Sequence, residues 1–319
     1  MTESILDIKH LYIQYPIYIG TVRAGENINV SLNKGEVMGL VGESGCGKST
    51  LGFSILRMLK PPGRVTQGQM LYHGRDIVSM SEKEILALRG NNISMIFQDP
   101  LTSLNPLFRI DKQFIETIRI HEKHTTKKDA LDRAEDILKR LGISPGRLYE
   151  YPHQMSGGMR QRIMIGMGLI LSPDLLIADE PTTSLDVIVE AQFLDLLNEL
   201  RKQFDLTILL ITHNLGVVAQ LADRITVMYA GTVAEIGSSE AVFADPLHPY
   251  TQGLLASIPN IKLDQPTLET MPGQTPDLVN PPSGCRFHPR CPRVMDICSQ
   301  EIPPSFQKNG TQVTCWLYQ

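Results

Sequence analysis

The segment Gly42-Glu-Ser-Gly-Cys-Gly-Lys-Ser-Thr50 decides the fold of this chain. It matches the phosphate-loop pattern G-x-x-x-x-G-K-[ST] and directly follows an apolar run, Val37–Val41, that is typical of a buried strand. The residues from Leu51 to Leu59 predict a helix. Strand, glycine-rich loop and helix in this order are the context that the motif requires. We therefore predict a nucleotide-phosphate site here, and not a glycine-rich turn that matches by chance.

Each residue type in the loop suits a bound phosphate chain. The glycines allow a tight turn whose N–H groups point inward without Cβ clashes, and the start of the next helix adds its dipole. We expect Lys48 to reach the β- and γ-phosphates of ATP and Ser49 to offer its hydroxyl to Mg²⁺. The predicted nucleotide-binding residues of the loop are Gly42, Glu43, Ser44, Gly45, Cys46 (a small filler), Gly47, Lys48, Ser49 and Thr50.

A second motif, Ser156-Gly157-Gly158, precedes the apolar stretch Ile163–Leu171, which predicts a buried helix. Serine is a good helix N-cap and two glycines leave the helix start open, so this is a second potential phosphate site. Alone the motif is weak, because serine–glycine pairs are common in loops. The apolar run that ends in Asp179 and Glu180 strengthens it. We expect Asp179 to hold Mg²⁺ through its water shell and Glu180 to polarise the attacking water.

In the order of these motifs the chain resembles the ATP-binding cassette (ABC) ATPases over roughly its first four-fifths. The resemblance implies that Tyr15 stacks on adenine, that Gln98 links Mg²⁺ and the attacking water to the transporter contact, and that His213 contacts the γ-phosphate. Ser184-Leu-Asp186 resembles the D-loop of the family. Taken singly, Tyr15 could be an ordinary strand aromatic, Gln98 a polar loop residue and His213 a satisfied histidine. Their positions relative to the other motifs favour the family roles.

The expected fold class is α/β. The family resemblance implies a P-loop (RecA-like) core with a parallel sheet, an antiparallel β-subdomain, an inserted helical subdomain and a C-terminal Cys-rich extension. Strands that alternate with helices up to about residue 237 agree with a parallel sheet. Apolar residues on one face of 126–141, followed by Gly142 as a helix end, predict a helix in the insertion. We assign residues 1–260 to the nucleotide-binding domain, with the helical insertion at about 99–172, and residues 261–319 to the extension.

The position of the second phosphate motif predicts a dimer. A signature helix on an inserted arm lies too far from its own Lys48 to close over the same ATP. The family resemblance implies a head-to-tail dimer in which Ser156, Gly157 and Gly158 cover the ATP of the partner subunit. Closure then controls hydrolysis, and motion of the arm would drive a membrane permease.

Composition excludes several classes of protein. The chain has 319 residues, a net charge of −4 and a pI of about 6.1, which argues against a nucleic-acid partner. The longest apolar run, Ile163–Leu171, is far shorter than the about 18 residues that cross a bilayer. The sequence begins on a strand-like segment, so we expect no signal peptide. We expect a peripheral protein on the cytoplasmic side of the cell membrane, attached through a partner.

The segment Asp245–Leu255, which contains His248-Pro-Tyr250, resembles ATPases of oligopeptide and dipeptide importers. The resemblance implies an ATP-hydrolysing subunit that works with two transmembrane permease subunits and, indirectly, an extracytoplasmic substrate-binding protein. Its second ATPase subunit would be a different chain (heterodimer) or a copy of itself (homodimer). Alternatives are import of nickel or oligosaccharides, a soluble ABC ATPase that acts as a mechanical or regulatory module, and a weakly active heterodimer partner.

Four of the five cysteines, Cys285, Cys291, Cys298 and Cys315, follow a proline-rich linker. Clustered thiols in a cytosolic chain argue against disulfides and suit either Zn²⁺ or an iron–sulfur cluster. The absence of C-x₂-C pairs disfavours zinc. Four unrelated buried cysteines are the remaining alternative. Resemblance to peptide-importer ATPases with a similar tail implies a [4Fe-4S] cluster of structural role. Because the linker separates the tail from Lys48 and Gln98 in sequence, we expect Cys291→Ser to destabilise the tail while the phosphate loop survives.

Overall fold

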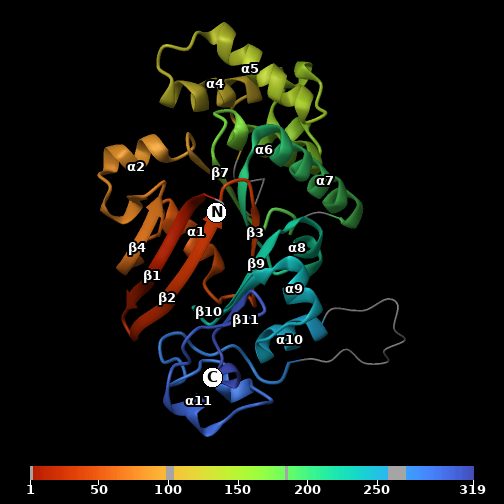
Figure 1. Ribbon diagram of the computed structural model, residues 1–319. Coiled ribbons are helices and arrows are strands. Elements are labelled where there is room, and N and C mark those ends of the chain that lie inside the picture. The colour runs from red at the N-terminus through yellow and green to blue at the C-terminus, as the bar shows by residue number, and fades with distance from the viewer. Residues whose placement is uncertain (1–2, 98–103, 184–185, 258–270) are drawn as a thin grey trace. The chain divides into compact units, whose positions relative to one another are not determined.

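The computed structural model describes residues 3–97, 104–183, 186–257 and 271–319 (Figure 1). The chain divides into two compact units. The first unit contains Met1–Met80 and Leu209–Gln319, and the second contains Ser81–Ile208. The boundary between them falls inside strand β8 (Thr207–Ile211).

The first unit contains an antiparallel sheet with the order β2-β1-β4-β5, which confirms the predicted antiparallel β-subdomain. Two long strands joined by the short turn around Tyr18 and Ile19 form its main hairpin, drawn in red in Figure 1. Alternate apolar side chains such as Leu6 and Ile8 are buried, as a sheet with one covered face requires. The strands are β1 (Ser4–Ile17), β2 (Gly20–Asn33), β4 (Arg64–Tyr72) and β5 (Arg75–Asp76).

The second sheet of this unit has the order β11-β12-β10-β9-β3-β8. Strands β3 and β9 are parallel, and every residue of β3 is buried, as its continuous apolar run predicted. Strands β9 and β10 form an antiparallel hairpin, so the predicted alternation of strands and helices ends one strand earlier than expected. The strands are β3 (Val37–Val41), β9 (Arg224–Tyr229), β10 (Thr232–Ser238), β11 (Phe306–Lys308) and β12 (Thr311–Val313).

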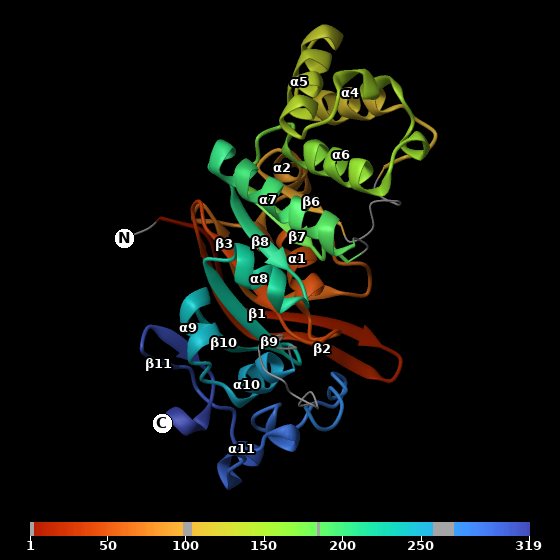
Figure 2. The same ribbon diagram turned by 90° about the vertical axis from the view of Figure 1, so that its right-hand side faces the viewer.

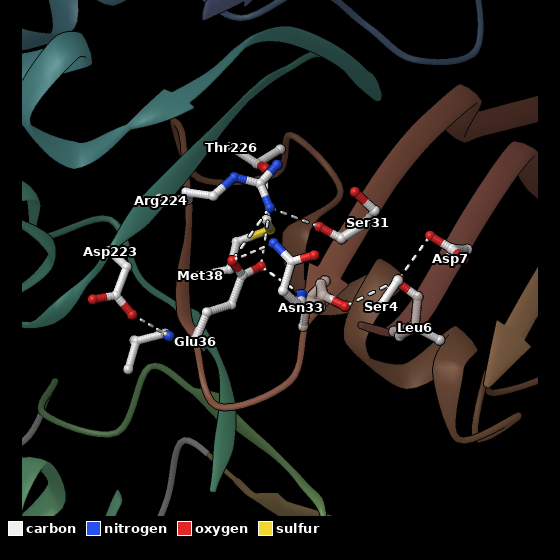
Figure 3. A network of polar contacts seen from close by, with 12 residues as sticks. Ser4, Leu6, Asp7, Ser31, Asn33, Glu36, Met38, Asp223, Arg224 and Thr226 are labelled. Carbon is white, nitrogen blue, oxygen red and sulfur yellow. Dashed lines mark hydrogen bonds and ion pairs between the residues drawn. The ribbon is translucent and has the colours of Figure 1, made fainter. Parts of the chain in front are cut away.

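Polar contacts fix the start of β3 (Figure 3). The Glu36 carboxylate accepts hydrogen bonds from Asn33 N and Nδ2 at 2.8 and 2.9 Å and pairs with Arg224 Nη1 at 3.0 Å. The backbone N–H of Val37 donates to the Asp223 carboxylate at 2.8 Å. The strand that leads into the phosphate loop is therefore anchored at its first residue.

The helix after the phosphate loop begins at Lys48 and ends at Ile55, so it is shifted from the predicted range of Leu51 to Leu59. It ends early because Arg57 adopts a left-handed backbone with φ of 49°, which a right-handed helix excludes. The helical segments of the unit are α1 (Lys48–Ile55), η1 (Ile77–Ser79), α8 (Leu215–Leu221), α9 (Ser239–Ala244), α10 (Pro249–Ala256), η4 (His288–Arg290), α11 (Asp296–Gln300) and η5 (Trp316–Tyr318).

The C-terminal segment is part of the first unit. Strand β12 pairs with β10, so the tail adds two strands to the sheet (Figure 2). Val313 and Cys315 pack against Leu247 in a small apolar cluster. The predicted domain boundary between residues 260 and 261 lies outside the described residues and stays a prediction.

The second unit contains the strands β8-β7-β6, with β6 and β7 parallel, and a group of helices that includes α4, α5 and α6 (Figure 2). Helix α5 confirms the predicted amphipathic helix: Ala130, Ala134 and Ile137 are buried on one face, and Gly142 follows its end with φ of 68°. The elements are α2 (Glu82–Leu88), β6 (Ile93–Ile96), α4 (Ile110–His121), α5 (Lys127–Arg140), η2 (Pro145–Tyr149), η3 (Pro152–Gln154), α6 (Gly157–Leu169), β7 (Leu175–Asp179) and α7 (Val187–Phe204).

Among the helices of the described residues, none combines the length and the apolar character that crossing a membrane demands.

His248 should make the stability of the protein depend on pH. It caps α10 by accepting a hydrogen bond from Tyr250 N at 3.0 Å, and burial lowers its pKa from 6.5 to about 4. The unfolded chain takes up a proton below about pH 6.5, but the folded chain does so only near pH 4. The free energy of unfolding should therefore fall by about 3 kcal/mol between these pH values.

The measurement is urea unfolding of wild type and His248→Asn at a series of pH values. Asparagine keeps the capping function but does not titrate. Burial raises the pKa of the neighbouring Glu235 carboxyl, so only the difference between the two proteins reports on His248. Equal pH slopes for both proteins would contradict the prediction.

Candidate nucleotide-binding site

The phosphate loop forms a continuous turn between β3 and α1 in the first unit. Gly42 and Gly47 have φ of 149° and 103°, in the region that favours glycine. Neither position has room for a side chain. A Cβ at Gly42 would lie 2.1 Å from Met228 O, and one at Gly47 would lie 2.2 Å from Ala24 O. Gly42 and Gly47 are thus needed for both backbone conformation and packing, whereas Gly45 has φ of 79° but room for a Cβ.

Lys48 is the first residue of α1, and its side chain is buried. Its ammonium group donates to the carbonyl oxygens of Gly42 at 2.7 Å and Glu43 at 3.0 Å. These contacts hold a positive charge inside the loop, next to the positive end of the helix dipole. The arrangement is suited to binding an anion, and the role of Lys48 as a phosphate ligand stays a prediction.

Cys46 is buried within the loop, with its Sγ 3.8 Å from Lys48 Nζ. Burial raises the pKa of its thiol, although the nearby ammonium lowers it. Its carbonyl accepts a hydrogen bond from Gly231 N at 2.9 Å, which ties the loop to the β9–β10 turn. The burial agrees with the predicted small filler.

Asp179 and Glu180 lie at the end of β7 in the second unit, as predicted. Asp179 is the buried last residue of the strand, and Glu180 follows with a left-handed backbone at φ of 47°. This conformation is uncommon for a residue other than glycine, and such strained positions cluster at functional sites. The Glu180 carboxylate accepts a hydrogen bond from Thr183 Oγ1 at 2.9 Å. Eight other described non-glycine residues also have positive φ, so the role of Glu180 stays a prediction from its place after β7.

Ser156 caps α6, and its hydroxyl accepts a hydrogen bond from Met159 N at 3.3 Å, as predicted. A Cβ at Gly157 would meet nothing within 4 Å, and one at Gly158 would meet only Val189 at 3.5 Å. Crowding within the described chain therefore does not explain the two glycines. They leave the start of the helix open to another molecule.

The other predicted residues have less informative surroundings. Tyr15 is half-buried on β1, and a Cβ at Gly63 would lie 2.3 Å from its ring. His213 is exposed in the loop after β8. Asp186 caps α7 by accepting a hydrogen bond from Val189 N at 2.9 Å. Gln98, Ser184 and Leu185 lie outside the described residues, so their predicted roles stay predictions.

The sequence analysis missed two residues that contact the loop. Tyr250 Oη accepts a hydrogen bond from Glu43 N at 2.9 Å, and Arg290 forms a bidentate ion pair with the Glu43 carboxylate. The C-terminal part of the chain therefore contacts the phosphate loop, and the survival of the loop in a Cys291→Ser variant stays a prediction. The only signal for Tyr250 was its place in His248-Pro-Tyr250, and nothing in the sequence marked Arg290.

The part of the chain that the structure describes contains no group of three or more His, Cys, Asp or Glu side chains arranged to hold a metal ion. The predicted metal-binding role of the four tail cysteines is not confirmed, and neither are the predicted Mg²⁺ ligands Ser49, Gln98 and Asp179.

Comparison with known protein families supports an ABC-type ATPase. The family model "ABC transporter" matches residues 25–183, and "Oligopeptide/dipeptide transporter, C-terminal region" matches residues 234–298. The dipeptide transport ATP-binding protein DppD of Bacillus subtilis (strain 168) is 47% identical over 319 residues, covering 99% of this chain and 95% of that protein. The oligopeptide transport ATP-binding protein OppD of Escherichia coli (strain K12) is 45% identical over 303 residues, covering 94% and 89%.

Solved structures of similar fold include ABC transporter proteins. The cbiO1 protein of Clostridium perfringens, part of the ABC transporter complex cbiONQ, has a TM-score of 0.66 and 30% identity, covering 76% of this chain and 92% of that chain. A dimeric ATP-binding cassette in a post-hydrolysis state with ADP and Pi has a TM-score of 0.65 and 25% identity, covering 73% and 98%.

The fold and the phosphate loop define an ABC-type ATPase. Within this class, the chain belongs to the family of dipeptide and oligopeptide transport ATP-binding proteins.

Substitution of Glu180 should separate nucleotide binding from hydrolysis. Glu180→Gln should keep ATP binding but slow hydrolysis by about 10²–10⁴-fold, because the group that polarises water is lost. Lys48→Ala should abolish tight nucleotide binding. Glu199→Gln, an exposed carboxylate on α7, is the control and should behave as wild type. Phosphate release and ATP binding are measured in the assembled transporter, where normal turnover of Glu180→Gln would refute the assigned role.

Proposed function

We propose that this chain is the ATP-hydrolysing subunit that powers import of dipeptides or oligopeptides through a membrane permease. The observation that carries the proposal is the match of residues 234–298 to the C-terminal region of oligopeptide/dipeptide transporters. Relatives named as dipeptide and oligopeptide transport ATP-binding proteins support it along nearly the whole chain. We keep residues 1–260 as the nucleotide-binding domain and 261–319 as the extension.

The chemistry is that of phosphoryl transfer, in which the protein contributes positioning and charge stabilisation. The loop N–H groups, the start of α1 and Lys48 would hold the triphosphate of ATP, and Tyr15 would stack on adenine. Ser49 and Asp179, with Gln98, would hold Mg²⁺, which neutralises charge on the phosphates. Glu180 would polarise the attacking water and His213 would contact the γ-phosphate.

The open start of α6 supports a role in a head-to-tail dimer. Ser156, Gly157 and Gly158 would cover the ATP held by a second ATPase subunit, either a different chain or a copy of this one. Two transmembrane permease subunits would hold the ATPases at the cytoplasmic side of the cell membrane. An extracytoplasmic binding protein would deliver the cargo, without contacting this chain.

Deletion of the gene tests the cargo. Uptake of labelled dipeptides and oligopeptides should be lost and should return with the wild-type gene but not with a Glu180→Gln copy. Nickel and oligosaccharide uptake are measured in the same strains as controls. Unchanged peptide uptake with lost nickel or sugar uptake would refute the peptide assignment and leave the ATPase mechanism standing.

The four tail cysteines are further proposed to hold a [4Fe-4S] cluster. Burial raises the pKa of the Cys285 thiol to about 11, and the Cys298, Cys315 and Cys291 thiols add to the rise, although the described residues contain no group of side chains already arranged to hold a metal ion. The Cys285 N–H also donates to Cys298 O at 2.8 Å. A bound cluster would cross-link the segments of the tail.

Iron content tests this proposal. Protein purified without oxygen should be brown and contain about four irons per chain. Cys291→Ser should lower the iron content, whereas Cys46→Ser, which changes the cysteine outside the tail, should keep it. Stoichiometric zinc without iron in the wild-type protein would refute the cluster.

A further inference from the structure

Two side chains from the C-terminal part of the first unit hold Glu43, the second residue of the phosphate loop. The backbone N–H of Glu43 donates to Tyr250 Oη at 2.9 Å. Arg290 donates to the Glu43 carboxylate through Nη1 at 2.8 Å and through Nη2 at 3.0 Å. Such paired bonds fix direction as well as distance. We propose that Arg290 and Tyr250 are positioning residues for the phosphate loop and set the affinity of the loop for nucleotide phosphates.

The two side chains are themselves held in place. The Arg290 side chain is only 6% exposed, and its Nε donates to Pro272 O at 2.8 Å. Its guanidinium also lies over the Tyr229 ring at 5.8 Å. Tyr250 is fully buried, with ring centroids 4.6 Å from Tyr229 and 5.4 Å from Phe287. Groups locked by packing lose little entropy when they position a neighbour, so this pair can impose one conformation on Glu43.

The contact continues from Glu43 to Lys48. The carbonyl of Glu43 accepts a hydrogen bond from Lys48 Nζ at 3.0 Å. Tyr250 therefore fixes the N–H of this residue, Arg290 fixes its side chain, and its carbonyl fixes the ammonium that we expect to bind phosphate. A shift of Glu43 would move both a loop peptide and the main positive charge of the site.

Charge gives Arg290 a second effect. Glu43 places a negative charge in a loop built to bind a polyanion, and like charges repel most strongly where water is excluded. Arg290 neutralises this charge within the loop. Without Arg290, the Glu43 carboxylate would oppose the phosphates directly.

The phosphate-loop motif does not explain why an acid stands at position 43. This position is one of the four variable residues in G-x-x-x-x-G-K-[ST], so the motif allows any side chain. Its partners Tyr250 and Arg290 both lie in residues 234–298, which match the oligopeptide/dipeptide transporter C-terminal region. The same region that distinguishes this family thus supplies both contacts to the loop.

Nucleotide titration of the purified full-length chain tests the inference. The non-hydrolysable analogue AMP-PNP with Mg²⁺ is titrated by calorimetry, and the melting temperature of each variant is recorded. Arg290→Gln should raise the dissociation constant about tenfold, since it leaves a partly buried carboxylate unpaired. Tyr250→Phe should raise it by a smaller factor, because one hydrogen bond is lost. Arg290→Lys keeps the charge but not the paired bonds, so its affinity should be intermediate.

The matched control is Arg224→Gln. It breaks an arginine–glutamate pair of similar length, Arg224 with Glu36 at 3.0 Å, at the other end of β3 (Figure 3). This variant should lower the melting temperature but leave the dissociation constant within about twofold of wild type.

A second substitution distinguishes neutralisation of the Glu43 charge from a merely structural role of Arg290. Adding Glu43→Gln to Arg290→Gln removes the unpaired carboxylate, so most of the lost affinity should return. The inference is overturned if Arg290→Gln binds the analogue as wild type does, if Arg224→Gln weakens binding equally, or if the double variant shows no recovery. None of these outcomes bears on the peptide cargo, because the assay contains no permease and no peptide.

Discussion

A loop that turns its N–H groups toward an anion must find other partners for its carbonyls and side chains, and it cannot find them in regular secondary structure. In this chain the loop is held from outside at several points. Gly231 N donates to Cys46 O, Tyr250 accepts from Glu43 N, and Lys48 occupies the carbonyls of Gly42 and Glu43. Backbone polar groups buried without partners are costly, so these contacts both satisfy the loop and fix its shape.

The strand before the loop is likewise held in place by contacts to residues later in the sequence. Strand β3 is buried at every residue and is anchored at its start by Glu36, Arg224 and Asp223. Its far end leads directly into the loop that Arg290 and Tyr250 hold. Both ends of one rigid strand are thus fixed by ion pairs or hydrogen bonds to residues late in the sequence. Folding of the C-terminal part and shaping of the phosphate loop become parts of one process.

This dependence explains what the sequence could and could not predict. The bounds of β3 and the end of β7 followed from continuous apolar runs, because a central parallel strand is buried on both faces. The end of α1 was missed because its stop at Arg57 is a backbone conformation, which no strong residue signal marks. Strands β11 and β12 are three residues each, too short for an alternating pattern.

The residues of the site also fall into those that the sequence could predict and those that it could not. The glycines, Lys48 and Ser156 could be found because local geometry demands these residue types at fixed spacing. The Arg290–Glu43 pair joins residues 247 positions apart, and any loop position with a charged residue could have hosted it. Only the folded tail brings the two together, so local sequence patterns carry no trace of the contact.

Thermodynamic linkage makes the coupling between the C-terminal tail and bound nucleotide reciprocal. If an ordered tail tightens nucleotide binding by some factor, bound nucleotide must stabilise the ordered tail by the same factor. Cys291 follows Arg290 in the sequence, so the segment that carries the tail cysteines also carries the guanidinium that pairs with Glu43. The tail is therefore energetically coupled to the phosphate loop even though it supplies no group to the phosphates. If Arg290 and Tyr250 position the loop as we infer, nucleotide affinity depends on the fold of the C-terminal region.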